Sequence, residues 1–179
     1  SAGVIGNSIV QLRDNLRRLA RQLELLANDD IYNKELNALV STGALGLSIE
    51  KLRNMLRGFG EQAKLLAIDD LHNPKLDDII SNGDFGRQFA YIRDIFRMLA
   101  HQAELIASDD LLNPELDESV TDGVMGAAFV TMRDNLRKLL AQARLIAQGN
   151  LNHSNIKRKD GEKQGVLQNE FYTMTDNLR

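Results

Sequence analysis

The feature of this sequence that most restricts its fold is an internal repeat of about 40 residues. The pattern of residues 1–17 returns at 41–57, 81–97 and 121–137, and once more at 163–179 with a shift of two residues. A repeat of this length predicts that each period is one supersecondary unit, which packs against its neighbours because it cannot bury its apolar face alone. The length of 179 residues therefore counts units instead of describing one large core.

The composition favours helices and excludes several classes of function. Hydrophobic residues make up 43% of the chain and aromatic residues 5%, with two prolines and no tryptophan, which is typical of helices packed through aliphatic side chains. A formal net charge of −3 gives no long-range attraction for nucleic acid or an anionic membrane. No run of ~18 apolar residues predicts a transmembrane helix. The absence of cysteine excludes disulfides and thiol chemistry and fits a reducing compartment.

Each period begins with apolar residues at the heptad spacing of a coiled coil, in alternating steps of four and three that start at Ile5 and Ile9. The positions between them are mostly charged or amide residues. This pattern predicts long helices that need near-parallel partners. We expect the following residues to form the dimer and bundle core: Ile9, Leu12, Leu16, Leu19, Leu23, Leu26, Ile49, Leu52, Leu56, Phe59, Leu66, Phe89, Ile92, Phe96, Leu99, Ile106, Phe129, Met132, Leu136, Leu139, Ile146, Phe171, Met174 and Leu178.

The connectors between the predicted helices also repeat. Because an antiparallel turn needs roughly 2 to 8 residues, connectors of about fifteen residues predict parallel helices, each beginning halfway along its predecessor. We expect apolar anchors at Ile31, Leu36, Val40, Leu71, Leu76, Ile80, Leu111, Leu116, Val120, Leu151 and Ile156. A glycine closes each connector, at Gly43, Gly83, Gly123 and Gly165, where we expect a positive φ or close packing. One chain places two helices at any level, so a parallel homodimer is expected to complete four-helix layers.

Acidic pairs stand where the predicted helices end, at 29–30, 69–70 and 109–110, and Gly149 and Asn150 replace them in the last period. We expect these pairs to form caps and turns instead of a cation site, because further oxygen ligands are missing nearby. The three histidines share no repeat position and are expected to be solvated: His72, His101 and His153. No catalytic set can be assembled, so no enzyme activity, cofactor, metal or small-molecule ligand is expected.

Two further polar sets recur once in each period. A glutamine precedes a core position at Gln22, Gln62, Gln102 and Gln142, and either bonds across the bundle or flanks it in solvent. Arginines recur at i,i+4, at 13 and 17, 53 and 57, 93 and 97, and 133 and 137. Like charges at this spacing destabilise an isolated helix by a few tenths of a kcal/mol, so a partner is expected, first among the acidic pairs.

The second helix carries glycines at Gly58 and Gly60, on either side of Phe59. Each glycine inside a helix costs ~1 kcal/mol relative to alanine. The sequence therefore predicts a hinge at this point, with a locally tolerated weakness as the alternative.

The motifs resemble a tandem array of HAMP units, the relay modules of histidine kinases, chemoreceptors and membrane-bound cyclases. In that family a first helix ends in a Gly-Asp-Leu-like signature and a second, parallel helix ends in a Phe-x-x-Met-x-x-x-Leu-like stretch. Residues 149–151 (Gly-Asn-Leu) and 171–178 (Phe-Tyr-Thr-Met-Thr-Asp-Asn-Leu) match these signatures. The chain departs from the family pattern where a glutamate is expected, which is replaced by Val4, Ala44, Asp84, Val124 and Val166, and where Gln168 replaces a glycine.

The resemblance implies an all-α fold of stacked parallel four-helix bundles, formed by a homodimer in which adjacent units share a helix. The units are expected at 12–57, 52–97, 92–137 and 132–179, after the remnant of a preceding unit at 1–11. It also implies a non-catalytic, cytoplasmic relay between covalently linked input and output domains of a receptor or two-component protein. The alternative is a monomeric α-solenoid or passive helical scaffold, because Asn-Pro at 73–74 and 113–114 can open short second helices.

Overall fold

The computed structural model describes residues 2–38, 43–118, 120–157 and 165–179. Within these ranges the chain forms helices and no strand, which confirms the predicted all-α class. The α-helices are α1 (Ala2–Ala27), α2 (Ala44–Ala67), α3 (Asp84–Ala107), α4 (Val124–Ala147) and α5 (Val166–Asn177). Each connector between them contains one short 3-10 helix: η1 (Lys34–Asn37), η2 (Pro74–Asp77), η3 (Pro114–Asp117) and η4 (Ser154–Ile156).

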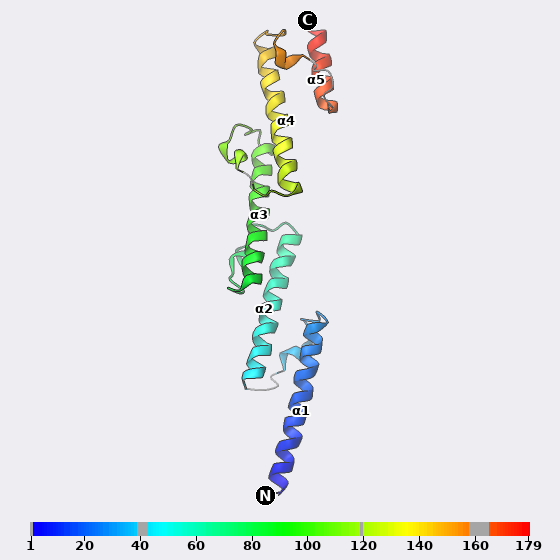
Figure 1. Ribbon diagram of the computed structural model, residues 1–179, viewed down its shortest axis with the longest axis vertical. Coiled ribbons are helices and arrows are strands. Elements are labelled where there is room, and N and C mark those ends of the chain that lie inside the picture. Colours follow the sequence, from blue (N-terminus) through cyan, green and yellow to red (C-terminus); the bar gives the residue numbers. More distant parts are fainter. Residues whose placement is uncertain (1, 39–42, 119, 158–164) are drawn as a thin grey trace. The chain divides into compact units, whose positions relative to one another are not determined.

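The chain forms two units, Ser1–Arg93 and Asp94–Arg179, and the boundary between them lies within α3. In the N-terminal unit α1 and α2 run parallel and side by side, and α2 begins beside the middle of α1 (Figure 1). In the C-terminal unit α4 and α5 are likewise parallel neighbours (Figure 1). The parallel order expected from connector length is thus confirmed for these helix pairs. The four overlapping units of the sequence analysis stay a prediction, as do the four-helix layers and the homodimer.

The core of the N-terminal unit lies where α1, its connector and α2 meet. Leu19 and Leu26 of α1 are buried together with Ile49 of α2, all three as the heptad spacing predicts. Further along, the ring of Phe59 packs edge-on against Phe85 of α3, with the ring centroids 4.6 Å apart. The heptad pattern therefore identifies the residues through which neighbouring helices of one chain pack.

The acidic pairs end the helices through a left-handed residue. Asp29 has φ 60°, the equivalent Asp69 and Asp109 have nearly the same value, and Gly149 has φ 73°. The N–H of Asp29 donates to Leu26 O at 3.2 Å, and the N–H of Asp30 donates to Leu25 O at 2.9 Å. These two bonds form a Schellman motif, which satisfies carbonyl groups that the end of a helix leaves unpaired. The predicted capping and turn role is confirmed.

The connector anchors are buried as expected, with two exceptions and one residue that lies outside the described ranges. Those below 9% exposure are Ile31, Leu36, Leu71, Leu76, Leu111, Leu116, Val120 and Ile156. Ile80 and Leu151 are half-buried. Val40 falls in the segment that the structure does not describe. Each described connector is therefore an ordered segment fixed to the helices by its own apolar side chains.

The glycines that close the connectors do not adopt the positive φ expected from the sequence. Gly43, Gly123 and Gly165 have φ of −78°, −80° and −70°, and each precedes its helix in extended conformation. The close approach of the backbone occurs three residues later instead. A Cβ on Gly86 would stand 1.8 Å from Ser81 O, and one on Gly126 would stand 1.9 Å from Thr121 O. Glycine is required there because the connector passes directly over the first turn of the helix.

The helix α2 continues without interruption through Gly58 and Gly60. A Cβ on Gly58 would stand 2.7 Å from Cδ1 of Ile80, the half-buried anchor of the next connector. Gly58 thus provides room for a neighbouring side chain, which accounts for one of the two glycines without a hinge. The hinge itself stays a prediction.

The last helix buries different residues from those that the heptad spacing predicts. Tyr172 and Thr175 are fully buried, whereas Met174 and Leu178 are exposed. Thr175 stands at the repeat position of Arg133 in α4, so α5 lacks one of the arginines that the other helices carry. The loss of that long polar side chain accompanies the burial of Tyr172, a residue with no aromatic counterpart at 130 in α4.

Candidate functional site

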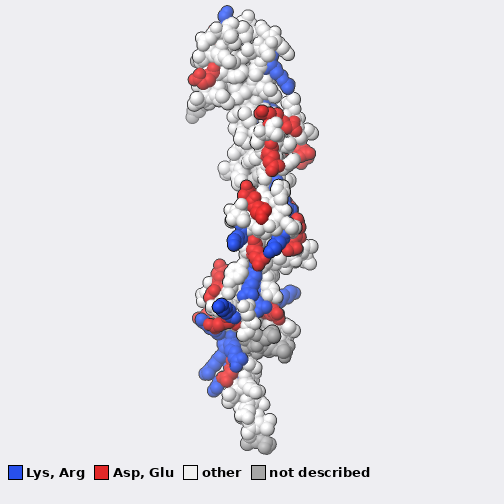
Figure 2. All heavy atoms as spheres, turned by 180° about the vertical axis from the view of Figure 1, so that it is seen from behind, with Lys and Arg blue, Asp and Glu red and all other residues white. Residues whose placement is uncertain are grey.

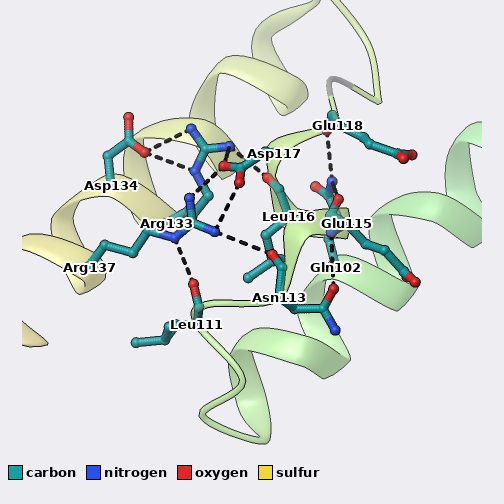
Figure 3. Close-up of polar contacts among 10 residues, drawn as sticks. All are labelled: Gln102, Leu111, Asn113, Glu115, Leu116, Asp117, Glu118, Arg133, Asp134 and Arg137. Atoms are coloured by element: carbon teal, nitrogen blue, oxygen red, sulfur yellow. Dashed lines mark hydrogen bonds and ion pairs between the residues drawn. The ribbon is translucent and has the colours of Figure 1, made fainter.

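Every connector is attached to the helix before it by a buried glutamine. Gln102 of α3 donates from Nε2 to the carbonyl oxygens of Glu115 at 3.1 Å and Glu118 at 2.9 Å (Figure 3). The same pair of bonds recurs in the first and second connectors, from Gln22 and Gln62. The solvated alternative is wrong, since all four glutamines are buried. Gln22, Gln62 and Gln102 bond to a connector of their own chain instead of across the bundle.

In the last period the glutamine has a different set of partners. Gln142 donates to the carbonyl oxygen of Asn155, and its own Oε1 accepts a bond of 2.8 Å from Nε2 of Gln168. Gln168 stands at the repeat position of Gly126, where the connector approaches the helix most closely. A glutamine in place of the glycine of the other periods thus adds a direct bond between α4 and α5.

Arginines attach the third connector, the one that Gln102 binds, to the helix that follows it. Arg133 of α4 donates to Leu116 O at 2.6 Å, and Arg137 donates to Leu111 O at 2.6 Å (Figure 3). Arg93 makes the first of these bonds in the second connector, to Leu76 O at 2.8 Å, and Arg179 makes the second in the last connector, to Leu151 O at 2.9 Å. The acidic pairs are therefore the wrong partners, because the guanidinium groups bind connector carbonyls instead.

A carboxylate adds to this contact in the third connector. Asp117 accepts a hydrogen bond from Arg137 and forms an ion pair with Arg133 at 3.3 Å (Figure 3). The hydrogen bond from Arg137 is the main reason why the pKa of Asp117 is lowered from its usual 3.8. We use the name connector clamp for three parts taken together: the glutamine of one helix, the connector that follows, and the arginines of the next helix. The clamp makes the two helices and the segment between them one hydrogen-bonded assembly.

A charged pair at the surface of the clamp joins the helix to the connector, and the positive residue lies on the helix in the first period but on the connector in the second. Arg21 of α1 lies 3.4 Å from Glu35, whereas Glu61 of α2 faces Lys75 at 4.0 Å. In the third period the partners are His101 and Glu115. His101 is therefore paired instead of simply solvated. The pairs join equivalent positions in the two periods although their charges are exchanged. Each helix and its own connector therefore carry complementary charges.

The second feature of the site is an apolar stripe that the single chain leaves uncovered. Some heptad positions are buried within the chain and others are exposed. Leu19, Phe59 and Leu99 are buried, whereas residues seven positions before each of them are exposed by 60%, 37% and 44% (Leu12, Leu52 and Ile92). The predicted core residues that are exposed are Ile9, Leu12, Leu16, Leu23, Leu52 and Ile92 in the N-terminal unit, and Phe96, Met132, Met174 and Leu178 in the C-terminal unit.

In the C-terminal unit the stripe borders an open groove. The groove has a volume of about 740 Å³, and Met132, Leu136 and Leu139 of α4 line it together with Leu167 of α5. Three of these four residues belong to the predicted bundle core. The groove is therefore the space between two parallel helices that the chain itself does not fill.

Comparisons with family models, with curated proteins and with solved structures gave no match for this chain. Among the described residues, no helix is long and apolar enough to cross a membrane. His72 lies exposed in the second connector, and Nδ1 of His153 accepts the N–H of Asn155 at 3.2 Å, where the other connectors use an asparagine. The connector clamp and the apolar stripe thus provide the basis for a functional interpretation.

The sequence indicated the apolar stripe but not the clamp. Periodicity shows which face of a helix is apolar, and it cannot show that Gln102 turns toward a connector carbonyl thirteen residues further on. One available indication was the recurrence of a glycine at Gly86 and Gly126, since a helix interior disfavours glycine unless another segment passes close by.

Proposed function

We propose that this chain is a relay array of the HAMP kind, which works as a parallel homodimer and passes a helix displacement between an input and an output domain. The observation that carries the proposal is the apolar stripe. Exposed apolar side chains along a helix mark an interaction site, and the heptad spacing of the stripe within each unit fits helices packed in a parallel bundle.

A second copy is the partner that this stripe fits best. Covering a side chain that is about half exposed contributes on the order of 1 kcal/mol. Without Ile9 and Leu16, which lie toward the free end of α1, eight such residues on each of two copies give on the order of 16 kcal/mol, against an association cost of ~4 to 15 kcal/mol. A two-fold axis brings the same stripe of both copies together and converts each pair of parallel helices into a four-helix layer.

The connector clamp supports a relay in which successive helices move together, instead of units that move independently. A displaced helix carries its connector with it through the buried glutamine, and the connector carries the next helix through the arginines. Small residues at Ala63, Ala103 and Ala143, among large apolar neighbours, leave room for a second packing arrangement of the layers. The relay is non-catalytic in this proposal, and the resemblance to receptors and kinases supplies its cytoplasmic setting and its linked partner domains.

The homodimer is tested by sedimentation equilibrium of two matched variants on α3. Ile92 belongs to the apolar stripe, and its neighbour Tyr91 is more exposed but lies outside the heptad positions. Ile92→Lys introduces two charges into the proposed layer and is expected to weaken the dimer at least ~100-fold, equivalent to ~2.7 kcal/mol. Tyr91→Lys is expected to leave the dimer intact. A wild-type chain that sediments as a monomer at micromolar concentration would refute the proposal and favour the solenoid alternative.

The relay is tested by imposing a helix rotation at one end and observing the other. A dimeric coiled coil is fused before α1 in two registers that differ by one residue, which rotates the entering helices by ~100°. Cysteine crosslinking across the dimer is then measured at residue 52 and at residue 132. A crosslinking pattern at 132 that depends on the register supports a relay. Identical patterns in both registers would show that the array is a passive spacer.

A further inference from the structure

The part of α1 that precedes residue 18 carries the residues that the later helices use to hold a connector. Gly6 stands at the repeat position of Gly86 and Gly126, and Arg13 and Arg17 stand at the positions of Arg133 and Arg137. In those helices the glycine lets a connector carbonyl approach and the arginines bind connector carbonyls. We call Gly6, Ile9, Arg13, Leu16 and Arg17 the receiving surface.

Nothing in the structure fills the receiving surface. No heavy atom lies within 4 Å of the Cβ position of Gly6. Among the described residues, Arg13 bonds its neighbour Asp14, and Arg17 has no polar partner. Ile9 is 61% exposed, whereas the equivalent Ile49, which packs against the first helix, is 5% exposed. The surface is thus formed but unoccupied within this chain.

Its charge and its glycine distinguish the expected occupant from a second copy. Figure 2 shows positively charged side chains gathered along α1, and this helix contains four arginines between residues 13 and 21. A parallel copy packs on the apolar stripe and leaves Arg17 without an acceptor. A connector presents carbonyl oxygens to both arginines, and in the third period it adds the carboxylate of Asp117.

We propose that the receiving surface binds the helix end and connector of a further repeat of the same type, joined ahead of α1. Arg13 and Arg17 bind carbonyl oxygens of that connector, and Gly6 admits its backbone over the first turns of α1. The inference rests on contacts within one chain, so it goes beyond the proposed relay and does not depend on the homodimer.

The test supplies the occupant from the chain itself. Residues 84–120 are fused directly before Ser1, which preserves the register because residue 121 is the repeat equivalent of residue 1. Hydrogen exchange is measured for the amides of residues 2–18 in the original and the extended chain. A docked connector is expected to slow exchange there by about tenfold or more. The control is the same extension with both buried anchors of its connector, Leu111 and Leu116, replaced by aspartate, which is expected to remove most of the protection.

A second readout uses the arginine that has no partner. Arg17→Ala is expected to leave the melting temperature of the original chain unchanged and to lower that of the extended chain. Arg137→Ala, whose connector is present in both chains, is expected to lower both. Equal exchange in the intact extension and in the extension without its two anchors, or an Arg17→Ala substitution that has no effect in the extended chain, would overturn the inference, whatever the oligomeric state.

Discussion

The strongest prediction concerns the glutamine of the connector clamp, tested by Gln102→Met. Methionine keeps the length and approximate volume of the side chain and removes the hydrogen bonds to the carbonyl oxygens of Glu115 and Glu118. A typical hydrogen bond contributes about 1 kcal/mol net, so the two together predict a loss of about 2 kcal/mol. The loss rises toward about 4 kcal/mol if no water replaces the lost donor, because Glu118 O then stays unpaired, whereas Glu115 O keeps the N–H of Glu118. Gln88→Met, at an exposed position of the same helix, is the matched control.

Both variants are unfolded in urea at one fixed protein concentration, since self-association would make the apparent stability depend on concentration. The free energy of unfolding is expected to fall for Gln102→Met and to change by less than about 0.5 kcal/mol for the control. Hydrogen exchange should be faster in residues 111–118 of the variant. A change below 0.5 kcal/mol together with unchanged exchange in the connector would refute the clamp as a stabilising contact.

A charged variant at the same position separates the hydrogen bonds from packing. Gln102→Glu places a carboxylate against two carbonyl oxygens at neutral pH, and is expected to destabilise more than methionine. Below the pKa of that carboxyl group the protonated acid donates one hydrogen bond, so the difference between the two variants should reverse. If the order of stability is the same at pH 7 and at pH 3, the carbonyl oxygens do not face this side chain.

Three further predictions follow from the backbone and from one ion pair. Asp69→Gly removes the cost of a left-handed conformation at φ 61° and is expected to raise the free energy of unfolding in urea by about 0.5 to 1 kcal/mol; a loss would contradict the αL assignment. Gly126→Ala brings a Cβ to 1.9 Å from Thr121 O and is expected to lower the melting temperature far more than Gly123→Ala, where the nearest atom is a side-chain oxygen at 3.4 Å. Because the pKa of Asp117 is lowered on folding, its contribution is present above the usual value of 3.8 and is lost as the pH falls through the folded pKa. Asp117→Asn should therefore reduce the loss of stability measured between pH 5 and pH 2, as the unfolding midpoint will show.

The helices and their parallel order could be predicted because they depend on short-range periodicity and on connector length. Anchors such as Leu36 and Leu76 could be predicted for the same reason, since an apolar residue recurs within a polar segment and both prove to be buried. Periodicity also identified Leu19 and Leu99 as core positions. It did not separate them from Leu12 and Ile92, because burial within one chain depends on which neighbour covers each position of the heptad.

The rest depended on which segments meet in space. Gly86 is required because the carbonyl of Ser81 passes over it. The recurrence of glycine indicates a close approach but does not show which segment makes it. Opposite charge made the acidic pairs the expected partners of the arginines. The backbone offers a larger supply of acceptors, and Arg137 binds Leu111 O, one residue beyond the pair at 109–110. Tyr172 was missed because the last connector is longer by two residues and because Thr175 replaces the arginine.

The reversed charged pair has a consequence for how such a gene can rearrange. Recombination between repeats can delete a period and join a helix from one repeat to a connector from another. Such a product would place Arg21 opposite Lys75, where the parent has Arg21 with Glu35 and Glu61 with Lys75. The like charges would cost at most a few tenths of a kcal/mol to ~1 kcal/mol at this exposed site. Selection can therefore distinguish the original order of the repeats from a shuffled one, even though every period builds the same backbone.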